Sequence, residues 1–184
     1  MISVAMMKAF QTFNDNDKRA KSLLKICKKL DTNKFKNICI VGWNSEIEPQ
    51  KKITIIEPTY YDFLKNNNNI NYINKFCWKD NKTHFDLIQC NDPDANYGVE
   101  SKSKVPNTVT IDELGNFDLI IDLAINSYYE VLLGAERNLK ENHPIITHSL
   151  FSVRFKEIQD YLLSLGYTDS YFVKHNDNIL VCYE

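Results

Sequence analysis

Three segments of this chain each follow a short apolar run, and their residue types are suited to chemistry. They are Gly42 with Trp43 and Asn44, Glu57 with Pro58, and His148. The carboxylate of Glu57 has two acceptor oxygens, which suit a vicinal diol of a ligand or, alternatively, the cap of a following helix. An imidazole titrates near neutral pH, so His148 is a candidate general base. The alternative for His148 is a partly buried side chain that is hydrogen-bonded to the neighbouring loop.

The elements that must position these residues follow from the apolar pattern. Short apolar runs, typical of buried strands in a parallel sheet, occur at residues 37–42, 52–57, 117–125 and 144–148. Further strands are predicted at residues 70–78 and 83–90, and a polar loop at residues 91–104. Helices are predicted at residues 60–65, 128–142 and 155–165, and a closing hairpin at residues 171–174 and 178–183.

Strands that alternate with helices predict a doubly wound α/β domain with a mostly parallel sheet. The closing hairpin adds an antiparallel C-terminal strand. We predict that residues 37–184 form this domain and that residues 1–36 form a helical segment packed on it, because apolar residues from Ala20 to Leu30 have amphipathic spacing. Ligands of such sheets bind beyond the carboxyl ends of the strands, where the three candidate segments would lie.

Composition excludes several classes of protein. Hydrophobic residues make up 43% of the chain and charged residues 25%, which is typical of a globular protein and not of a disordered one. The 22 basic and 24 acidic residues give a net charge of −2, so the chain lacks the basic excess that nucleic-acid binding needs. No stretch approaches the roughly 20 apolar residues of a membrane span, and we expect no membrane partner.

Cysteine and histidine spacing bears on metal sites and on the cellular compartment. The five cysteines are widely spaced with no Cys-x-x-Cys pair, which indicates buried thiols in a reducing, cytoplasmic compartment. His143 and His148 flank one predicted strand at opposite ends, so they are too far apart to share a metal ion, and we predict no metal site. No Gly-x-Gly-x-x-Gly motif occurs, which disfavours a nicotinamide-dependent dehydrogenase.

A series of motifs occurs in order in the second half of the chain. They are Thr110-Ile-Asp-Glu-Leu114, Glu130-Val-Leu-Leu-Gly-Ala135, Asn142-His-Pro144 and the segment YLLSLGYTDSYFV. In this order they resemble the FkbM family of class I S-adenosylmethionine-dependent methyltransferases, over about residues 37–184. The resemblance implies a Rossmann-like fold, S-adenosylmethionine as the cofactor, and methyl transfer as the reaction.

The resemblance also implies roles for single residues. Gly42 and Asn44 match the family's glycine-rich turn, whose backbone approaches the amino-acid moiety of the cofactor, and bulky Trp43 stands between them. Glu57 and Pro58 match the family's Glu-Pro pair, whose carboxylate binds both ribose hydroxyls. These residues are the predicted cofactor-binding set.

The chain departs from the family's acidic motifs. Ile40 stands where the turn has an acid, and Glu46 stands where it has its second glycine. The acidic segment after the central strand is also altered, and Asp122 takes the place of its first Asp only with a shift of one residue. Asp122 and His148 are the catalytic candidates.

Two functions of different classes follow from these observations. The first is an O-methyltransferase that acts on a sugar or another small hydroxylated acceptor. The second is a catalytically inactive methyltransferase-like domain that serves as a binding or assembly module. The retained Gly42, Asn44 and Glu57 favour the first, and the altered acidic motifs favour the second. The acceptor and the oligomeric state do not follow from the sequence.

Overall fold

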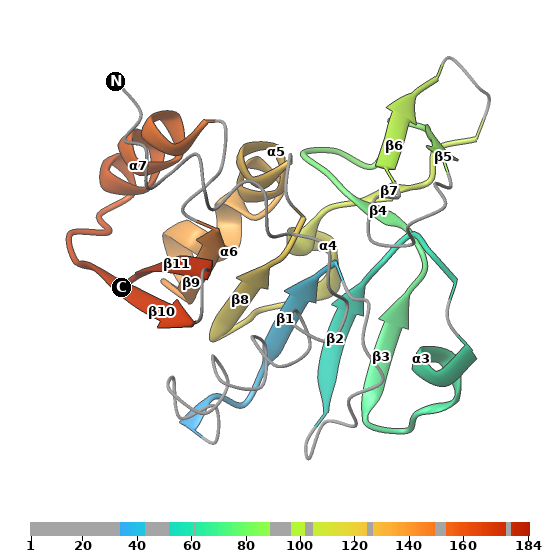
Figure 1. The fold of residues 1–184 in the computed structure, drawn as a ribbon, viewed down its shortest axis with the longest axis horizontal. Coiled ribbons are helices and arrows are strands. Elements are labelled where there is room, and N and C mark those ends of the chain that lie inside the picture. Colours follow the sequence, from blue (N-terminus) through green and yellow to red (C-terminus); the bar gives the residue numbers. More distant parts are fainter. Residues whose placement is uncertain are drawn as a thin grey trace.

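The computed structural model describes residues 34–42, 52–60, 62–88, 97–101, 105–124, 127–149, 154–175 and 178–184. At its centre lies a seven-stranded sheet with the strand order β10-β11-β9-β8-β1-β2-β3 (Figure 1). Most of the predicted N-terminal helical segment lies outside the described residues, as do Trp43 and Asn44.

Four of the five parallel strands form at the short apolar runs of the sequence. β1 (Ile38–Val41) and β8 (Leu119–Asp122) lie side by side in the middle of the sheet, and every residue of both is buried. β2 (Ile53–Ile56) and β3 (Ile70–Ile73) continue the sheet on one side, and β9 (Ile145–Ser149) continues it on the other. All five strands run in the same direction, as expected for strands buried on both faces.

The C-terminal strands reverse the direction of the sheet. β11 (Asn178–Tyr183) pairs antiparallel with β9, and β10 (Ser170–His175) pairs antiparallel with β11. This confirms the predicted hairpin and, with it, the predicted mostly parallel α/β sheet with an antiparallel C-terminal strand.

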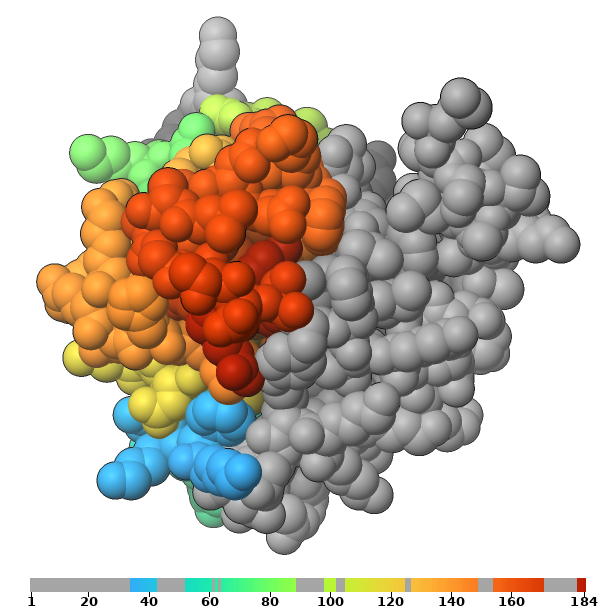
Figure 2. Space-filling model, turned by 90° about the vertical axis from the view of Figure 1, so that its left-hand side faces the viewer, coloured from blue at the N-terminus to red at the C-terminus, as the bar shows by residue number. Residues whose placement is uncertain are grey.

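Short helices and two small sheets complete the fold. The helices are α3 (Asp62–Asn66), α4 (Ile111–Leu114), α5 (Tyr128–Leu133), α6 (Glu136–Glu141) and α7 (Phe155–Ser164). β4 (Phe76–Cys77) pairs with β7 (Thr108–Val109), and β5 (Phe85–Ile88) pairs with β6 (Tyr97–Glu100). The β5–β6 hairpin stands apart from the main sheet in Figure 1, and α7 forms much of the face seen in Figure 2. No helix among the described segments is both long and apolar enough to cross a membrane.

Side chains of the central strands alternate between two apolar layers. Cys39 and Ile120 belong to a layer that includes buried residues of α5, α6 and α7. Ile40 and Ile121 belong to the opposite layer, which includes Leu64 of α3. Each strand residue therefore points to one layer or the other according to its position in the strand. The same rule applies to Asp122, the polar residue that ends β8.

Three predicted elements differ from the structure. The strand predicted at residues 70–78 is interrupted and forms β3 and β4, which belong to different sheets. At the interruption, the side chain of Asn74 donates to the carbonyls of Glu57 and Pro58 at 3.2 and 2.9 Å, so it fastens the chain to the end of β2. The polar loop predicted at residues 91–104 contains β6, because this segment pairs with β5.

The helix predicted at residues 128–142 is divided into α5 and α6 at Gly134. A Cβ atom at Gly134 would lie 2.1 Å from the carbonyl oxygen of Trp78, so the backbone of another segment packs directly on this position. The sequence pattern contains the glycine but not the neighbour that requires it.

Candidate functional site

The carboxyl ends of β1, β2 and β8 meet at one edge of the sheet. Val41 lies beside Ile56 of β2 on one side and beside Asp122 of β8 on the other. The backbone N–H of Gly42 donates to the carbonyl of Ile56 at 2.9 Å. Three of the predicted site residues, Gly42, Glu57 and Asp122, therefore lie at or directly after the ends of adjacent strands.

Gly42 turns the chain away from β1. Its φ is +80°, a conformation that side chains with a Cβ rarely adopt. A Cβ atom there would lie 3.4 Å from the nitrogen of Ala124, which is an ordinary contact. The backbone conformation, and not lack of space, therefore requires glycine at this turn.

Glu57 lies directly after β2 and is buried. Its backbone N–H donates to the carbonyl of Ile73 at 3.1 Å, which ties it to β3. Its Oε1 atom accepts from the backbone N–H of Thr59 at 2.7 Å. The carboxylate therefore stabilises its own turn, two residues away, whereas α3 begins only at Asp62. It has the position predicted for ribose binding, and one oxygen already serves the fold.

Asp122 ends the central strand β8, and its side chain is 1% exposed. Oδ1 accepts from the backbone N–H of Ala124 at 2.9 Å. Oδ2 is buried and has no hydrogen-bond partner among the described residues. An unpaired buried polar atom costs about 1–3 kcal/mol, so this position is not optimised for stability.

Burial governs the ionisation of this carboxyl group. Burial raises the pKa of Asp122 well above its ordinary value, and the hydrogen bond from Ala124 acts in the opposite direction. The Asp122 charge also contributes to raised pKa values of Cys39 and Cys77, whose main cause is again burial. Burial therefore disfavours the charged form of all three groups.

His148 lies on β9, one residue after Thr147, the last residue of β9 that pairs with β8, and is 1% exposed. Three aromatic rings surround its imidazole. Tyr183 stacks on it with a centroid distance of 5.5 Å and an interplanar angle of 9°, and the rings of Tyr128 and Phe155 lie at 5.4 and 6.0 Å. The ring is therefore enclosed by side chains from β11, α5 and α7.

The two catalytic candidates lie on adjacent strands. Ile121 pairs with Thr147, so continuing the parallel register by one residue places Asp122 beside His148 on the same face of the sheet. The register therefore places these two residues on neighbouring strands at the carboxyl edge. Their burial shows that a substrate would have to displace neighbouring side chains to reach either one.

Comparison with solved structures identifies the fold. A search with this chain found the methyltransferase FkbM from Methylobacillus flagellatus KT, with 17% sequence identity and a TM-score of 0.52. The match covers 72% of this chain and 36% of the other, so this chain spans about a third of the length of that protein. The fold is that of an FkbM-type methyltransferase. The predicted resemblance is confirmed at this level.

A second match is the methyltransferase domain of bacterial CtHen1, with 11% identity, 91% of this chain and 98% of that chain covered, and a TM-score of 0.39. No protein-family model matches the chain, and no curated protein matches it in sequence.

S-adenosylmethionine is the cofactor that a methyltransferase fold implies, and the polar groups at the edge fit it. The turn at Gly42 presents backbone beside the ends of β2 and β8. Glu57 supplies a carboxylate at the end of β2, and the buried Oδ2 of Asp122 is an acceptor with no partner among the described residues. Trp43 and Asn44, the rest of the predicted set, lie outside the described residues.

Tyr183 was not among the predicted site residues, although it stacks on His148. Its hydroxyl is buried without a hydrogen-bond partner among the described residues, and burial raises its pKa to about 12. The only sequence signal was the apolar C-terminal run that contains it, and that run predicts a strand, not the residue its aromatic ring contacts.

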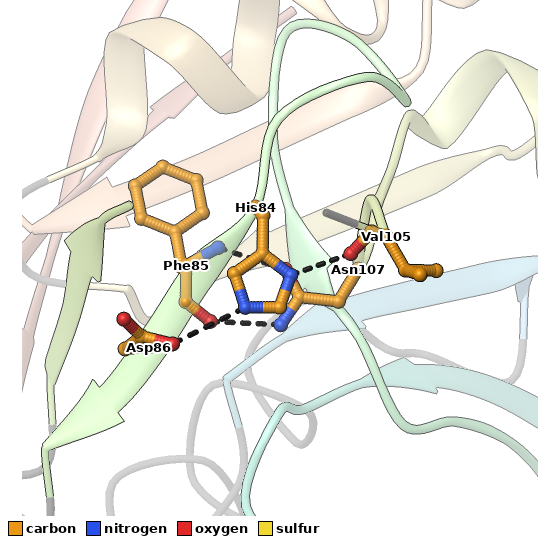
Figure 3. A network of polar contacts seen from close by, with 5 residues as sticks. All are labelled: His84, Phe85, Asp86, Val105 and Asn107. Carbon is orange, nitrogen blue, oxygen red and sulfur yellow. Dashed lines mark hydrogen bonds and ion pairs between the residues drawn. The ribbon is translucent and has the colours of Figure 1, made fainter. Parts of the chain in front are cut away.

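A polar network on the β5–β6 hairpin was also not predicted (Figure 3). His84 Nδ1 donates to the carbonyl of Val105 at 2.5 Å, and Nε2 contacts Asp86 Oδ1 at 3.2 Å. The amide of Asn107 accepts from the N–H of Phe85 at 2.9 Å and donates to its carbonyl at 2.8 Å. Three of these four contacts join His84 and Phe85 to residues 105–107, so the network supports the fold of the β5–β6 hairpin.

Acidic, histidine and cysteine side chains do not form a metal centre in the part of the chain that the structure describes. No group of three or more of them is placed there to hold an ion.

Proposed function

We propose that this chain is an S-adenosylmethionine-dependent methyltransferase that methylates a hydroxyl group of a sugar or another small hydroxylated acceptor. The observation that carries the proposal is the convergence of Gly42, Glu57 and Asp122 at the ends of β1, β2 and β8. This edge includes the point between β1 and β8 from which the strand order runs in both directions, where open α/β sheets bind ligands.

The residues of the edge have distinct roles in this proposal. The turn of Gly42, Trp43 and Asn44 holds the amino-acid moiety of the cofactor, and Glu57, followed by Pro58, holds the ribose. The bound cofactor supplies an electrophilic methyl group on a sulfonium. The protein's main contribution to such an in-line displacement is to orient the acceptor oxygen.

Proton handling would belong to the buried pair of Asp122 and His148. A hydroxyl that becomes methylated must lose its proton, and the imidazole of His148 is the candidate acceptor. The aromatic side chains around His148 must move for the acceptor to approach, so the proposal includes a rearrangement of Tyr128 or Phe155. The proposal also includes a cytoplasmic location and no nucleic-acid or membrane partner. These parts of it are supported by the sequence alone.

The alternative is an inactive domain that binds a partner. One observation favours it: Ile40, at the position of the family's acid, is 2% exposed and packed in the apolar layer opposite Asp122. The acid on β1 is thus replaced by core packing.

Calorimetric titration with S-adenosylmethionine and S-adenosylhomocysteine separates the two functions. We expect binding by the unmodified protein and, because a charge-assisted hydrogen bond is lost, about ten- to a hundredfold weaker binding by Glu57→Ala. Glu136→Gln, a change in an exposed acid of α6, is the matched control and should bind like the unmodified protein. Absence of binding at millimolar cofactor would reject the enzyme and support the partner-binding domain.

A further inference from the structure

The unpaired oxygen of Asp122 is the starting point. Buried polar atoms are nearly always hydrogen-bonded, and each exception needs an explanation. The side chain of Asp122 is 1% exposed, Oδ1 is bonded to Ala124, and Oδ2 is unpaired among the described residues. Because this oxygen lies at the ligand-binding edge, the group that satisfies it can come from a ligand.

The position of Asp122 also differs from that of the acid it would replace. Ile40 and Ile121 lie in one apolar layer, whereas Cys39 and Ile120 lie in the other. Since neighbours two residues apart share a face, Asp122 points to the side of Ile120. It lies next to Val41, directly before the Gly42 turn. An acid is therefore present beside this turn, but it comes from β8 and reaches the turn from the other face of the sheet.

We propose that Asp122 is the counter-ion of the α-ammonium group of the cofactor and that it releases its proton when the cofactor binds. This inference rests on the proposed function. The ammonium is the group of S-adenosylmethionine that combines a positive charge with N–H donors, whereas the sulfonium has a charge and no such donor. The O–H bond of the carboxylic acid breaks, its electron pair stays on the carboxylate, the proton passes to the solvent buffer, and the carboxylate accepts an N–H of the ammonium.

The surroundings of Asp122 explain why its proton is retained before binding. Among the described residues, two buried thiols face it, Cys39 from β1 and Cys77 from β4, and His148 of β9 lies at the next position of the β8–β9 register. Neither thiol can neutralise a carboxylate, and burial raises the pKa of Asp122. A cation that arrives beside the carboxyl group reverses this preference, since an opposite charge within a few ångströms favours the ionised form.

The test is calorimetry of S-adenosylhomocysteine binding at pH 6 in two buffers that differ in their heat of ionisation. The difference in binding heat gives the number of protons released. We expect a net release of up to one proton from the unmodified protein, and none from Asp122→Asn, which keeps the size of the side chain and the acceptor for Ala124. The same change should weaken binding by about ten- to a hundredfold. 5′-Methylthioadenosine, which lacks the amino-acid moiety, should release no proton and bind both proteins equally.

The possible failures are distinct. If S-adenosylhomocysteine and 5′-methylthioadenosine both fail to bind the unmodified protein, the proposed function and this inference fall together. If S-adenosylhomocysteine binds without proton release, or if Asp122→Asn releases as many protons as the unmodified protein, the role of Asp122 is refuted and the proposed function stands. Thermal unfolding of both proteins shows that Asp122→Asn is folded, independently of any ligand.

Discussion

Two buried polar side chains, Asn138 and Asp122, differ in how completely they are hydrogen-bonded. Asn138, on α6, is 0% exposed, and its Oδ1 accepts from the N–H of Phe117 at 2.9 Å. Its Nδ2 donates to Asp112 Oδ1 and to the carbonyl of Gly115, both at 2.8 Å. Asp122 is as deeply buried, but only one of its oxygens has a partner among the described residues.

The difference separates a residue that supports the fold from a residue that is available for function. The amide of Asn138 joins α6 to the segment that leads into β8, and every group it offers is used. Asp122 lies at the carboxyl edge, where a fully bonded side chain would have nothing left for a ligand. Incomplete hydrogen bonding at a buried position is therefore the more informative sign of function.

The largest expected effect is at the fully bonded residue. Asn138→Ala removes the side-chain partners of the Phe117 N–H and of the Gly115 carbonyl, at about 1–3 kcal/mol for each unsatisfied group, whereas Asp112 keeps the backbone N–H groups of Arg137 and Asn138. We expect the free energy of unfolding to fall by roughly 3–5 kcal/mol in urea titrations. Asn142→Ala, which removes an exposed donor 3.3 Å from Asn138, is the control and should change it little. A loss below about 1 kcal/mol for Asn138→Ala would show that the network does not support the fold.

The next effect tests the close packing that divides α5 from α6. Gly134→Ala places a Cβ atom 2.1 Å from the carbonyl oxygen of Trp78, so backbone must move. We expect a loss of about 1–3 kcal/mol or more in thermal unfolding. Gly115→Ala is the complementary change, because its Cβ would meet nothing within 4 Å while its φ of 132° is unfavourable for alanine. If Gly134→Ala leaves the free energy of unfolding unchanged, the backbone of Trp78 does not pack closely on the junction between α5 and α6.

The third prediction concerns the pH dependence of stability, and here the substitution is expected to stabilise the protein. The pKa of Asp122 is raised in the folded protein, so above the ordinary carboxyl pKa the unfolded chain has lost a proton that the folded chain still holds. Stability from this group is then complete at low pH and falls as pH rises, by up to about 1.4 kcal/mol per pH unit, until the folded pKa is passed. Asp122→Asn should remove this slope and be more stable than the unmodified protein at neutral pH. Urea titrations from pH 4 to 8 that show the same slope in both proteins would contradict it.

The smallest effect is expected at a capped but exposed helix. Thr110 accepts from the N–H of Glu113 at 3.2 Å, and Glu113 returns the bond to the N–H of Thr110 at 3.0 Å, which forms a capping box at α4. Thr110→Ala should lower the free energy of unfolding by about 1 kcal/mol, while Thr110→Ser should nearly restore it. If Thr110→Ala lowered the free energy of unfolding as much as Asn138→Ala, exposed and buried hydrogen bonds would contribute equally, which would contradict the comparison.

Much of the fold was predictable because apolar runs and turns are local signals. The runs at β1, β2, β8 and β9 and the C-terminal hairpin appear where they were predicted, with bounds that differ by a few residues. Features that depend on distant segments were missed. Gly134 divides a predicted helix because Trp78 packs on it, and β6 replaces a predicted loop because β5 lies beside it.

The positions of the candidate residues along the sheet could be predicted from the sequence, but the contacts of their side chains could not. Glu57 and Asp122 were predicted from the resemblance to the family's motifs, and Glu57 also from its place after an apolar run. The bond from Thr59 to Glu57, the unpaired oxygen of Asp122 and the aromatic rings around His148 depend on side-chain positions. The partners of His148 come from β11, α5 and α7, which are separated from it in sequence, so no local pattern could reveal them.

The ionisation state of Asp122, followed by carbon NMR of protein labelled at its aspartate carboxyl groups, tests the central claim most directly. The resonance is assigned by its absence in Asp122→Asn. At pH 6 the account predicts the chemical shift of a carboxylic acid in the free protein and a change to that of a carboxylate when S-adenosylhomocysteine saturates the site. A carboxylate already present in the free protein, or a carboxylic acid that persists in the saturated complex, would contradict it.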